Sequence, residues 1–474
     1  PEPAPGSPPL SCPRVHPAGA TAPLKRTLSR CRAGESRTRV PVPYERPSMQ
    51  RMGPTARLLP LLAGLLALSH GQPGDEGPAN RSHPQAAGSG DGSPSLRIAP
   101  ANTDFALRLY HLVVSEAPGA NIFFSPLSIS VAYAMLSLGA NPQSRGQIFK
   151  GLGFNLTELA EADIHGGFQH LLRTLALPSH GLETHVGSAL FLSRDLEFLP
   201  TFLNATAAFY EPRLLHTNFR NPARATQLIN DHVQKDTRGK IASLVSELPA
   251  DTLMVLVNYI YFKALWEKPF ASTLTTPHHF HVDENTTVQV PMMQQDGQHH
   301  WFLHDRYLPC SVLRMDYQGD ARALFVLPDQ GKTRQVEEVL TPEMITRWNN
   351  LLQHRYLYKK LELYFPKFSI SSSYMLHQML PRLGFTHLFS RQAGLSGITK
   401  ELSLQVSRSF HKATLDVDEA GTEAAAATSS SSRFLSAWRN RNVLWFNRPF
   451  FVVIFSPSTQ SILFLGKVVN PTKS

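Results

Sequence analysis

Histidine and serine are residue types in this chain that could ligate a metal ion or take part in catalysis. Their spacing along the sequence indicates which of these roles is possible. His278, His279 and His281 form one cluster, and His299 and His300 form a second. Alternate side chains of a strand share a face, so His279 and His281 would offer two metal ligands without an evident third. Packed or surface histidines are commoner than sites, and the sequence predicts no resident metal.

The common catalytic motifs are missing from the sequence. It has no G-x-S-x-G elbow, no G-x-x-x-x-G-K-S/T phosphate loop, no H-E-x-x-H and no C-x-x-C. Ser, His and Asp all occur, as in almost any chain, and their presence alone is no evidence for a triad. The sequence therefore argues against an enzyme and predicts no catalytic residue and no obligatory cofactor.

One basic cluster is a candidate polyanion site. Arg355, Lys359 and Lys360 lie where an expected helix passes into an expected strand at Leu361. Clustered cations could hold the anionic groups of a sulfated polysaccharide such as heparin, which would then act as a modulator. The alternative is an ordinary solvated face, because the charges are few.

A low-complexity stretch between two strand-forming blocks stands out from the rest of the chain. It runs from Glu419 to Arg439, with small side chains in its first part apart from Glu423, then a serine run, then Phe434 and Leu435. A flexible linker would explain the serine run. It would not explain the apolar pair that follows.

The positive charge of the chain is concentrated at its front. The sequence has 46 Lys and Arg against 36 Asp and Glu, and ten of the basic but only three of the acidic residues lie in residues 1–71. The rest is nearly neutral. We therefore expect no nucleic-acid partner.

The front segment divides into parts of different composition. Residues 49–71 contain an apolar run, Leu58–Leu68, which is too short to span a bilayer but fits a secretory signal peptide. Residues 1–48 are interpreted as a non-native or untranslated leader, with a genuine basic leader as the alternative. Residues 72–97 are rich in Gly, Pro and Ser and are expected to be disordered.

Cysteine and sequon usage fit a secreted, extracellular product. Cys12 and Cys31 fall in the front segment, which leaves Cys310 alone in the mature chain, either buried or open to mixed disulfides. A chain without internal disulfides must depend on a large core. We predict glycosylation at four Asn-x-Ser/Thr sequons: Asn80, Asn155, Asn204 and Asn285.

Apolar periodicity places helices early in the body of the chain and strands late. Helices are expected after a cap at Asn102 or Thr103, over the buried stretch 121–140, and within 224–247, where the helix should end at Gly239. Leu253–Phe262 is expected to be a central strand, apolar on both faces. Further strands are expected at 280–282, 288–293, 310–316, 323–327, 361–368, 450–455 and 461–468. Without alternation of strands and helices, the class is α+β.

Six separated stretches, in this order and spacing, resemble the serpin family, and most closely its antitrypsin-like plasma clade. They are NIFFSPLSIS at 121–130, INDHVQKDTRGKI at 229–241, LVNYIYFKALWEKPF at 256–270, HKATLDVDEAGTEAAAAT at 411–428, FNRPF at 446–450 and LFLGKVV at 463–469. The resemblance covers residues 98–474. It implies one domain of three β-sheets and about nine helices, with an exposed reactive-centre loop at about 419–440.

The resemblance also implies a protease inhibitor that is cleaved as a substrate. By the family's spacing from Glu419, the cut bond is Leu435–Ser436, with Phe434 and Leu435 setting specificity; cuts after Arg433 or Phe434 would need a shorter loop. The cleaved loop would insert into the central sheet as a new strand and trap the acyl-enzyme. The hinge that starts insertion would be formed by Glu419, Gly421, Thr422, Ala424, Ala425, Ala426 and Ala427.

Two groups of supporting residues are carried over by motif. Trp266, Lys367 and Glu419 resemble the breach, where insertion starts. Hydrogen-bonded residues beneath it resemble the shutter: Ser125, Ser128, Asn258 and His411.

The expected partner is a serine protease, held in a covalent complex by a monomeric inhibitor. The apolar pair Phe434-Leu435 suits chymotrypsin-like proteases or tissue kallikreins. Because the same clade includes hormone carriers, a non-inhibitory serpin that carries a small hormone is the alternative.

Overall fold

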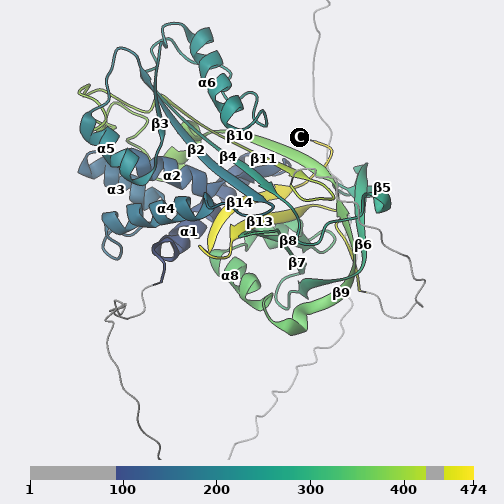
Figure 1. Ribbon diagram of the computed structural model, residues 1–474. Coiled ribbons are helices and arrows are strands. Elements are labelled where there is room, and N and C mark those ends of the chain that lie inside the picture. The colour runs from purple at the N-terminus through teal and green to yellow at the C-terminus, as the bar shows by residue number, and fades with distance from the viewer. Residues whose placement is uncertain (1–91, 423–441, 474) are drawn as a thin grey trace, which may run out of the picture. The chain divides into compact units, whose positions relative to one another are not determined.

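The computed structural model describes residues 92–422 and 442–473, and these belong to one compact unit (Figure 1). The expected leader 1–48, the signal peptide 49–71, Asn80 and the loop residues from 423 to 441 lie outside the described residues.

A five-stranded sheet forms the centre of the fold. Its order is β10 (Phe368–Met375), β11 (Arg408–Val417), β4 (Met254–Ala264), β2 (Leu182–Ser193) and β3 (Arg213–Thr217), with β11 and β4 parallel. Every residue of β4 except Lys263 is buried, because both faces of the strand are covered. The prediction of a central strand apolar on both faces is confirmed.

Alternate residues of β4 serve two separate cores, as the two-residue period of a strand requires. Val255, Val257 and Tyr259 pack against helix α6 (Pro222–Asp236) on one face. Leu256, Ile260 and other residues of the opposite parity pack in the main core. Figure 1 shows α6 lying over the sheet, away from the other helices.

The second sheet has nine strands and is continuous. Its order is β1 (Ile122–Phe124), β14 (Ser461–Val468), β13 (Phe450–Ser456), β8 (Arg322–Pro328), β7 (Cys310–Asp316), β6 (Thr287–His304), β9 (Tyr358–Pro366) and β12 (Asn442–Trp445), with β5 (Thr276–His281) paired to β6. Three sheets were expected. Here the second and third are joined, because the 18-residue β6 pairs with strands of both parts.

Nine α-helices occur among the described residues, in agreement with the expected number. Besides α6 they are α1 (Pro94–Glu116), α2 (Pro126–Ser137), α3 (Pro142–Gly151), α4 (Glu161–Leu175), α5 (Pro200–Phe209), α7 (Thr333–Glu338), α8 (Pro342–Leu351) and α9 (Leu376–Met379). Short 3-10 turns lie at Ser272–Leu274, Arg355–Leu357 and Leu380–Leu383. Six helices begin at a proline, whose fixed φ and missing N–H suit the first helical position. Figure 1 shows α1 to α5 gathered at one end of the sheets.

Two expected helix boundaries were wrong. The first helix begins at Pro94 rather than after Asn102, so residues 94–97 of the segment expected to be disordered are helical. The stretch 121–140 starts as strand β1, and its helix begins only at Pro126, where Ser125 caps the backbone N–H of Ser128.

Helix α6 ends at Asp236, three residues before the expected end at Gly239. Gly239 follows with φ of 84°, a left-handed conformation that glycine adopts without strain. The Asn230 side chain then accepts hydrogen bonds from the backbone N–H groups of Leu244 and Val245 at 2.9 Å. The chain therefore folds back beside α6 instead of continuing it.

A buried ion pair joins β14 to α7. Lys467 Nζ lies 2.7 Å from Glu337 Oε1, and the Tyr110 hydroxyl donates to the same oxygen at 2.5 Å. The Lys467 side chain is only 2% exposed. Removing the carboxylate would leave a buried ammonium without its counter-ion.

We expect Glu337→Gln to lower the free energy of unfolding by about 3 kcal/mol, measured by urea denaturation, because breaking a buried pair costs far more than the pair contributes. Glu338→Gln is the control. It removes an exposed carboxylate from the next position, paired only with Arg334 on the surface, and should change stability little. Equal effects of the two variants would contradict this account.

Candidate functional site

The chain turns sharply after β11, where the expected hinge begins. The Asp418 carboxylate accepts the backbone N–H groups of Ala420 at 2.9 Å and Gly421 at 3.1 Å, and the Asp418 N–H donates to the Gly421 carbonyl at 2.9 Å. This closed turn directs Thr422 back toward the ends of β4 and β11.

Backbone hydrogen bonds hold the hinge against the segment that follows β4. Trp266 N–H donates to the Ala420 carbonyl at 2.8 Å, and Thr422 N–H donates to the Ala264 carbonyl at 2.6 Å. Gly421 forms an antiparallel bridge with Leu265. It has φ of 155°, and a Cβ there would lie 2.1 Å from the Ala264 oxygen, so only glycine fits.

The structure brings the three predicted breach residues, Trp266, Lys367 and Glu419, together around this turn. The Trp266 ring is buried, stacks on Tyr317 at a centroid distance of 4.2 Å, and donates through Nε1 to the Asp418 carbonyl at 3.1 Å. Lys367 Nζ lies 2.7 Å from Glu419 Oε2. The Trp266 ring thus holds the Asp418 carbonyl of the turn, while the ion pair holds the side chain of Glu419.

Glu419 is held as a carboxylate. Partial burial favours its neutral form, but hydrogen bonds from Lys367 and from the Thr275 hydroxyl, the latter at 2.7 Å, outweigh burial and lower its pKa. Thr275, Asp418 and Tyr317 were not identified from the sequence, because their roles depend on contacts between distant segments and no local motif marks them.

The four predicted shutter residues form one buried hydrogen-bonded network. The His411 ring accepts the Ser125 backbone N–H at Nε2 at 3.0 Å, so the neutral ring carries its proton on Nδ1 and donates to Asn258 Oδ1 at 2.7 Å. Ser128 Oγ donates to the same Asn258 oxygen at 2.7 Å, and Asn258 Nδ2 donates to the Ser128 carbonyl at 2.6 Å. All four side chains belong to fully buried residues.

The His411–Asn258 bond links the two central parallel strands. His411 of β11 and Asn258 of β4 are direct partners in the ladder, which ends two rungs later at Ala413 and Ile260. Beyond that point, residues 414–417 of β11 and 261–264 of β4 have no rungs with each other. Thr422 is buried at this opening.

The other predicted sites are spread over the surface. Asn155, Asn204 and Asn285 are exposed, as a glycan requires, and so are Arg355, Lys359 and Lys360. Cys310 is buried, and its surroundings raise the pKa of its thiol to about 12, chiefly through burial and then through Asp305 and Asp329. Its thiol is therefore protonated and shielded.

The described residues contain no group of three or more His, Cys, Asp or Glu side chains able to hold a metal ion. No helix within residues 92–422 and 442–473 is both long and apolar enough to cross a membrane.

The family model for serpins, described as serine protease inhibitors, matches residues 100–471. The chain belongs to the serpin family and is a serine protease inhibitor rather than an enzyme. The resemblance drawn from the six motifs is confirmed.

Particular relatives agree with this assignment. Human kallistatin is 70% identical over 420 residues, which cover 88% of this chain and 98% of kallistatin. The structure of human glycosylated kallistatin matches with a TM-score of 0.77 and 71% identity, covering 81% of this chain and all of that one.

Two further structures bear on binding. Cleaved kallistatin complexed with heparin matches with a TM-score of 0.67 and 72% identity, covering 69% of this chain and 96% of that one. Human thyroxine-binding globulin matches with a TM-score of 0.75 and 43% identity, covering 80% of this chain and all of that one.

The shutter predicts a pH dependence of stability. Complete burial lowers the pKa of His411 to about 3, against about 6.5 in an unfolded chain. Between these values the unfolded state binds a proton that the folded state does not, so stability falls as pH falls, by about 1.4 kcal/mol per pH unit for this group.

We expect His411→Gln to flatten the fall in unfolding free energy between pH 6.5 and 4 relative to the wild type, measured by urea denaturation at each pH. His279→Gln, at an exposed position, should keep the wild-type slope. A slope unchanged in His411→Gln would show that the shutter histidine does not control it.

Proposed function

We propose that this inhibitor is secreted, that its target protease cleaves Leu435–Ser436, and that the cleaved loop inserts between β4 and β11. The observation that carries the proposal is the opening between these strands beyond Ala413 and Ile260, with the hinge held at its edge.

The proposed chemistry begins as ordinary proteolysis. The protease serine oxygen attacks the Leu435 carbonyl carbon, the Leu435–Ser436 amide breaks, the Ser436 amine takes a proton, and an ester joins Leu435 to the protease. Insertion then carries that ester away before water can hydrolyse it. About 14 residues at about 3.3 Å each would move the bound protease by about 45 Å.

Side-chain size along the loop fits insertion. The inward-facing parity is occupied by small residues only: Thr422, Ala424, Ala426, Thr428, Ser430 and Ser432. The first of them, Thr422, is already buried beside Phe262 and Thr414, around a cavity of about 10 Å³. A charged side chain at this parity would be buried without a partner, at a cost of several kcal/mol.

Insertion along the full length must separate strands that are joined in the present state. The His411–Asn258 hydrogen bond and the rungs from Arg408–Val255 to Ala413–Ile260 would all be replaced by bonds to the new strand. The breach pair Lys367–Glu419 lies outside this ladder and fixes the residue from which the hinge departs.

The target is proposed to be a chymotrypsin-like protease or a tissue kallikrein. Phe434 and Leu435 are apolar and suit a deep apolar specificity pocket. The 70% identity to kallistatin supports a kallikrein among the targets.

A sulfated polysaccharide is proposed as a modulator. Arg355, Lys359 and Lys360 are exposed, and the heparin complex of cleaved kallistatin supports such a ligand.

Secretion is supported by the three exposed sequons, Asn155, Asn204 and Asn285. The inhibitor is proposed to be a monomer, which is supported by Cys310, because its buried thiol is not available to link two chains.

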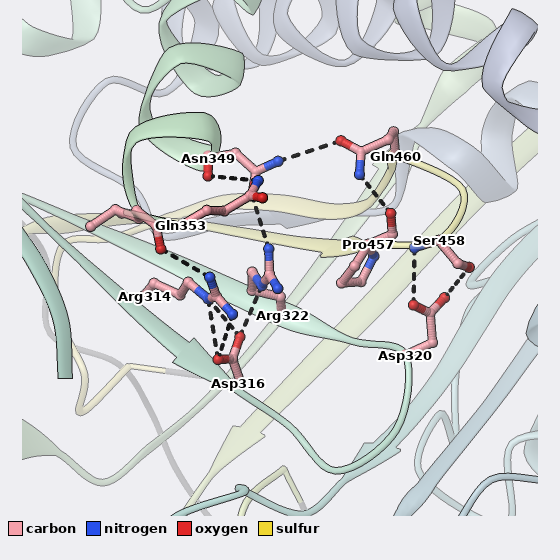
Figure 2. Close-up of polar contacts among 10 residues, drawn as sticks. Arg314, Asp316, Asp320, Arg322, Asn349, Gln353, Pro457, Ser458 and Gln460 are labelled. Atoms are coloured by element: carbon pink, nitrogen blue, oxygen red, sulfur yellow. Dashed lines mark hydrogen bonds and ion pairs between the residues drawn. The ribbon is translucent and has the colours of Figure 1, made fainter. Parts of the chain in front are cut away.

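A small-hormone carrier is the second candidate, favoured by a groove of about 830 Å³ between α1 and α8 and by the likeness to thyroxine-binding globulin. Gln460, which lines the groove, receives a hydrogen bond from Asn349 and donates one to the Pro457 carbonyl (Figure 2). A carrier would not need to trap its protease, and this difference separates the two functions.

Incubation with chymotrypsin, a chymase or a tissue kallikrein should give a complex that survives a denaturing gel, and the released C-terminal peptide should begin at Ser436 by mass. Cleavage without a complex would exclude the inhibitor and favour the carrier. A peptide that begins at Leu435 or Phe434 would show that the protease cleaves one or two bonds earlier in the chain than proposed.

We expect Thr422→Arg to convert the inhibitor largely into a substrate, because the guanidinium cannot be buried in the sheet. The complex band should fall at least tenfold while cleavage persists. Glu423→Arg, on the opposite parity, is the control and should still form the complex. Loss of complex in both variants would count against the parity argument.

Replacing Arg355, Lys359 and Lys360 with Ala should lower the salt concentration that elutes the protein from a heparin column, because fewer counter-ions are then exchanged. The matched control removes three exposed cations elsewhere, Lys150, Arg391 and Lys400. Identical elution of both triple variants would dismiss the cluster as a specific site.

A further inference from the structure

A second cationic feature lies beside the proposed polysaccharide cluster. A cavity of about 40 Å³ opens where β6, β7 and β9 meet the segment after Trp266. One water needs only about 10–15 Å³ of such space, so the cavity has room for a larger group. Its lining includes Lys268, His300, Arg314 and Tyr358.

His300 is the unusual member of this lining. It is only 5% exposed, and its Nε2 atom has no hydrogen-bond partner among the described residues. Buried polar atoms in folded proteins nearly always have a hydrogen-bond partner, so such an atom indicates a missing one. With the proton on Nε2, the ring would donate to an acceptor in the cavity.

Lys268 supplies a second donor and a positive charge. Its Nζ donates to the His299 carbonyl at 2.8 Å and to the Tyr358 hydroxyl, which leaves one of its three N–H groups for a ligand. The ammonium also lies over the Tyr358 ring, 4.7 Å from the centroid. Lys268 is thus held in place by protein contacts before any ligand arrives.

The acidic groups near the cavity are largely compensated. Figure 2 shows Arg314 and Arg322 both directed at Asp316, with nitrogen–oxygen distances of 2.8 Å and 2.9 Å. Glu267 is exposed at the rim and is the carboxylate that opposes an anion there.

We propose that this cavity binds a tetrahedral oxyanion, a sulfo or phospho group, with Lys268 and His300 as its donors. Charge-assisted hydrogen bonds from an ammonium and an imidazole suit the oxygens of such a group. Burial, followed by Lys268 and His299, lowers the pKa of His300 to about 4, so the ring is neutral at pH 7 and donates through one nitrogen only.

The strand register connects the cavity to the polysaccharide cluster. His299 pairs with Lys360, and His300 pairs with Lys359, across β6 and β9. Tyr358, which lines the cavity, directly precedes Lys359 in β9. Only the source of the bound group rests on the proposed function, and the site itself does not. A polysaccharide held by the cluster could place one sulfo group in the cavity.

Titration calorimetry of the full chain tests the site, with sodium sulfate and inorganic phosphate as probes at constant ionic strength. Lys268→Gln and His300→Gln should each weaken sulfate binding about tenfold, as loss of a charge-assisted bond implies. Glu267→Gln should strengthen it, while Lys150→Gln should leave it unchanged. No saturable sulfate binding to the wild type, or equal binding to all variants, would overturn the site.

The polysaccharide is tested apart from the site. If the site is real, the Arg355, Lys359 and Lys360 triple variant should retain sulfate binding; loss of it would place the sulfate on the surface cluster and overturn the cavity assignment. A heparin tetrasaccharide should bind Lys268→Gln more weakly than the wild type. If Lys268→Gln loses sulfate binding but binds the tetrasaccharide as tightly as the wild type, the cavity binds a free oxyanion. That result would count only against the polysaccharide as the source of the bound group.

Discussion

The structure depends on a ladder of backbone hydrogen bonds that ends early. Buried N–H and C=O groups need partners, yet β4 and β11 pair only as far as Ile260 and Ala413. Both strands continue beyond that point, each still paired on its outer side with β2 or β10. The pair of inner edges is a template for one more strand, and the chain carries a candidate strand directly after β11.

Two different kinds of contact control access to this template. At the open end, the hinge is held mainly by backbone bonds that any residue except proline could make, with glycine required only at Gly421. At the closed end, the strands are joined by side-chain hydrogen bonds as well as by the ladder. The neutral ring of His411 can accept from Ser125 and donate to Asn258 only in one tautomer. Substitutions are therefore expected to act through size at the hinge and through hydrogen bonding at the shutter.

Much of the fold and the site could be predicted from the sequence, for identifiable reasons. Apolar runs such as those of β4, β7 and β14 are long and contain little charge, so their strands were found within a residue or two. The boundaries that failed lie at Pro94 and Pro126, where a proline at the first helical position sets the start of the helix independently of apolar periodicity. Helices α3, α4 and α5 and strands β2, β3 and β11 were not placed, because their apolar patterns are interrupted or mixed. Breach and shutter residues were predicted through family motifs, and the structure shows each predicted set in contact. The pocket at His300 could not be predicted, because it depends on the register of β6 against β9.

The early end of the β4–β11 ladder limits how many protease molecules each inhibitor molecule can trap. If the cleaved loop inserts as proposed, the two strand edges accept one new strand and are then fully paired, and nothing in the chain rejoins the cleaved bond. Each molecule can therefore act once, and the capacity of the inhibitor in any fluid equals the number of intact copies present. That capacity is then replenished only by synthesis, in contrast to an enzyme, each molecule of which turns over many substrate molecules.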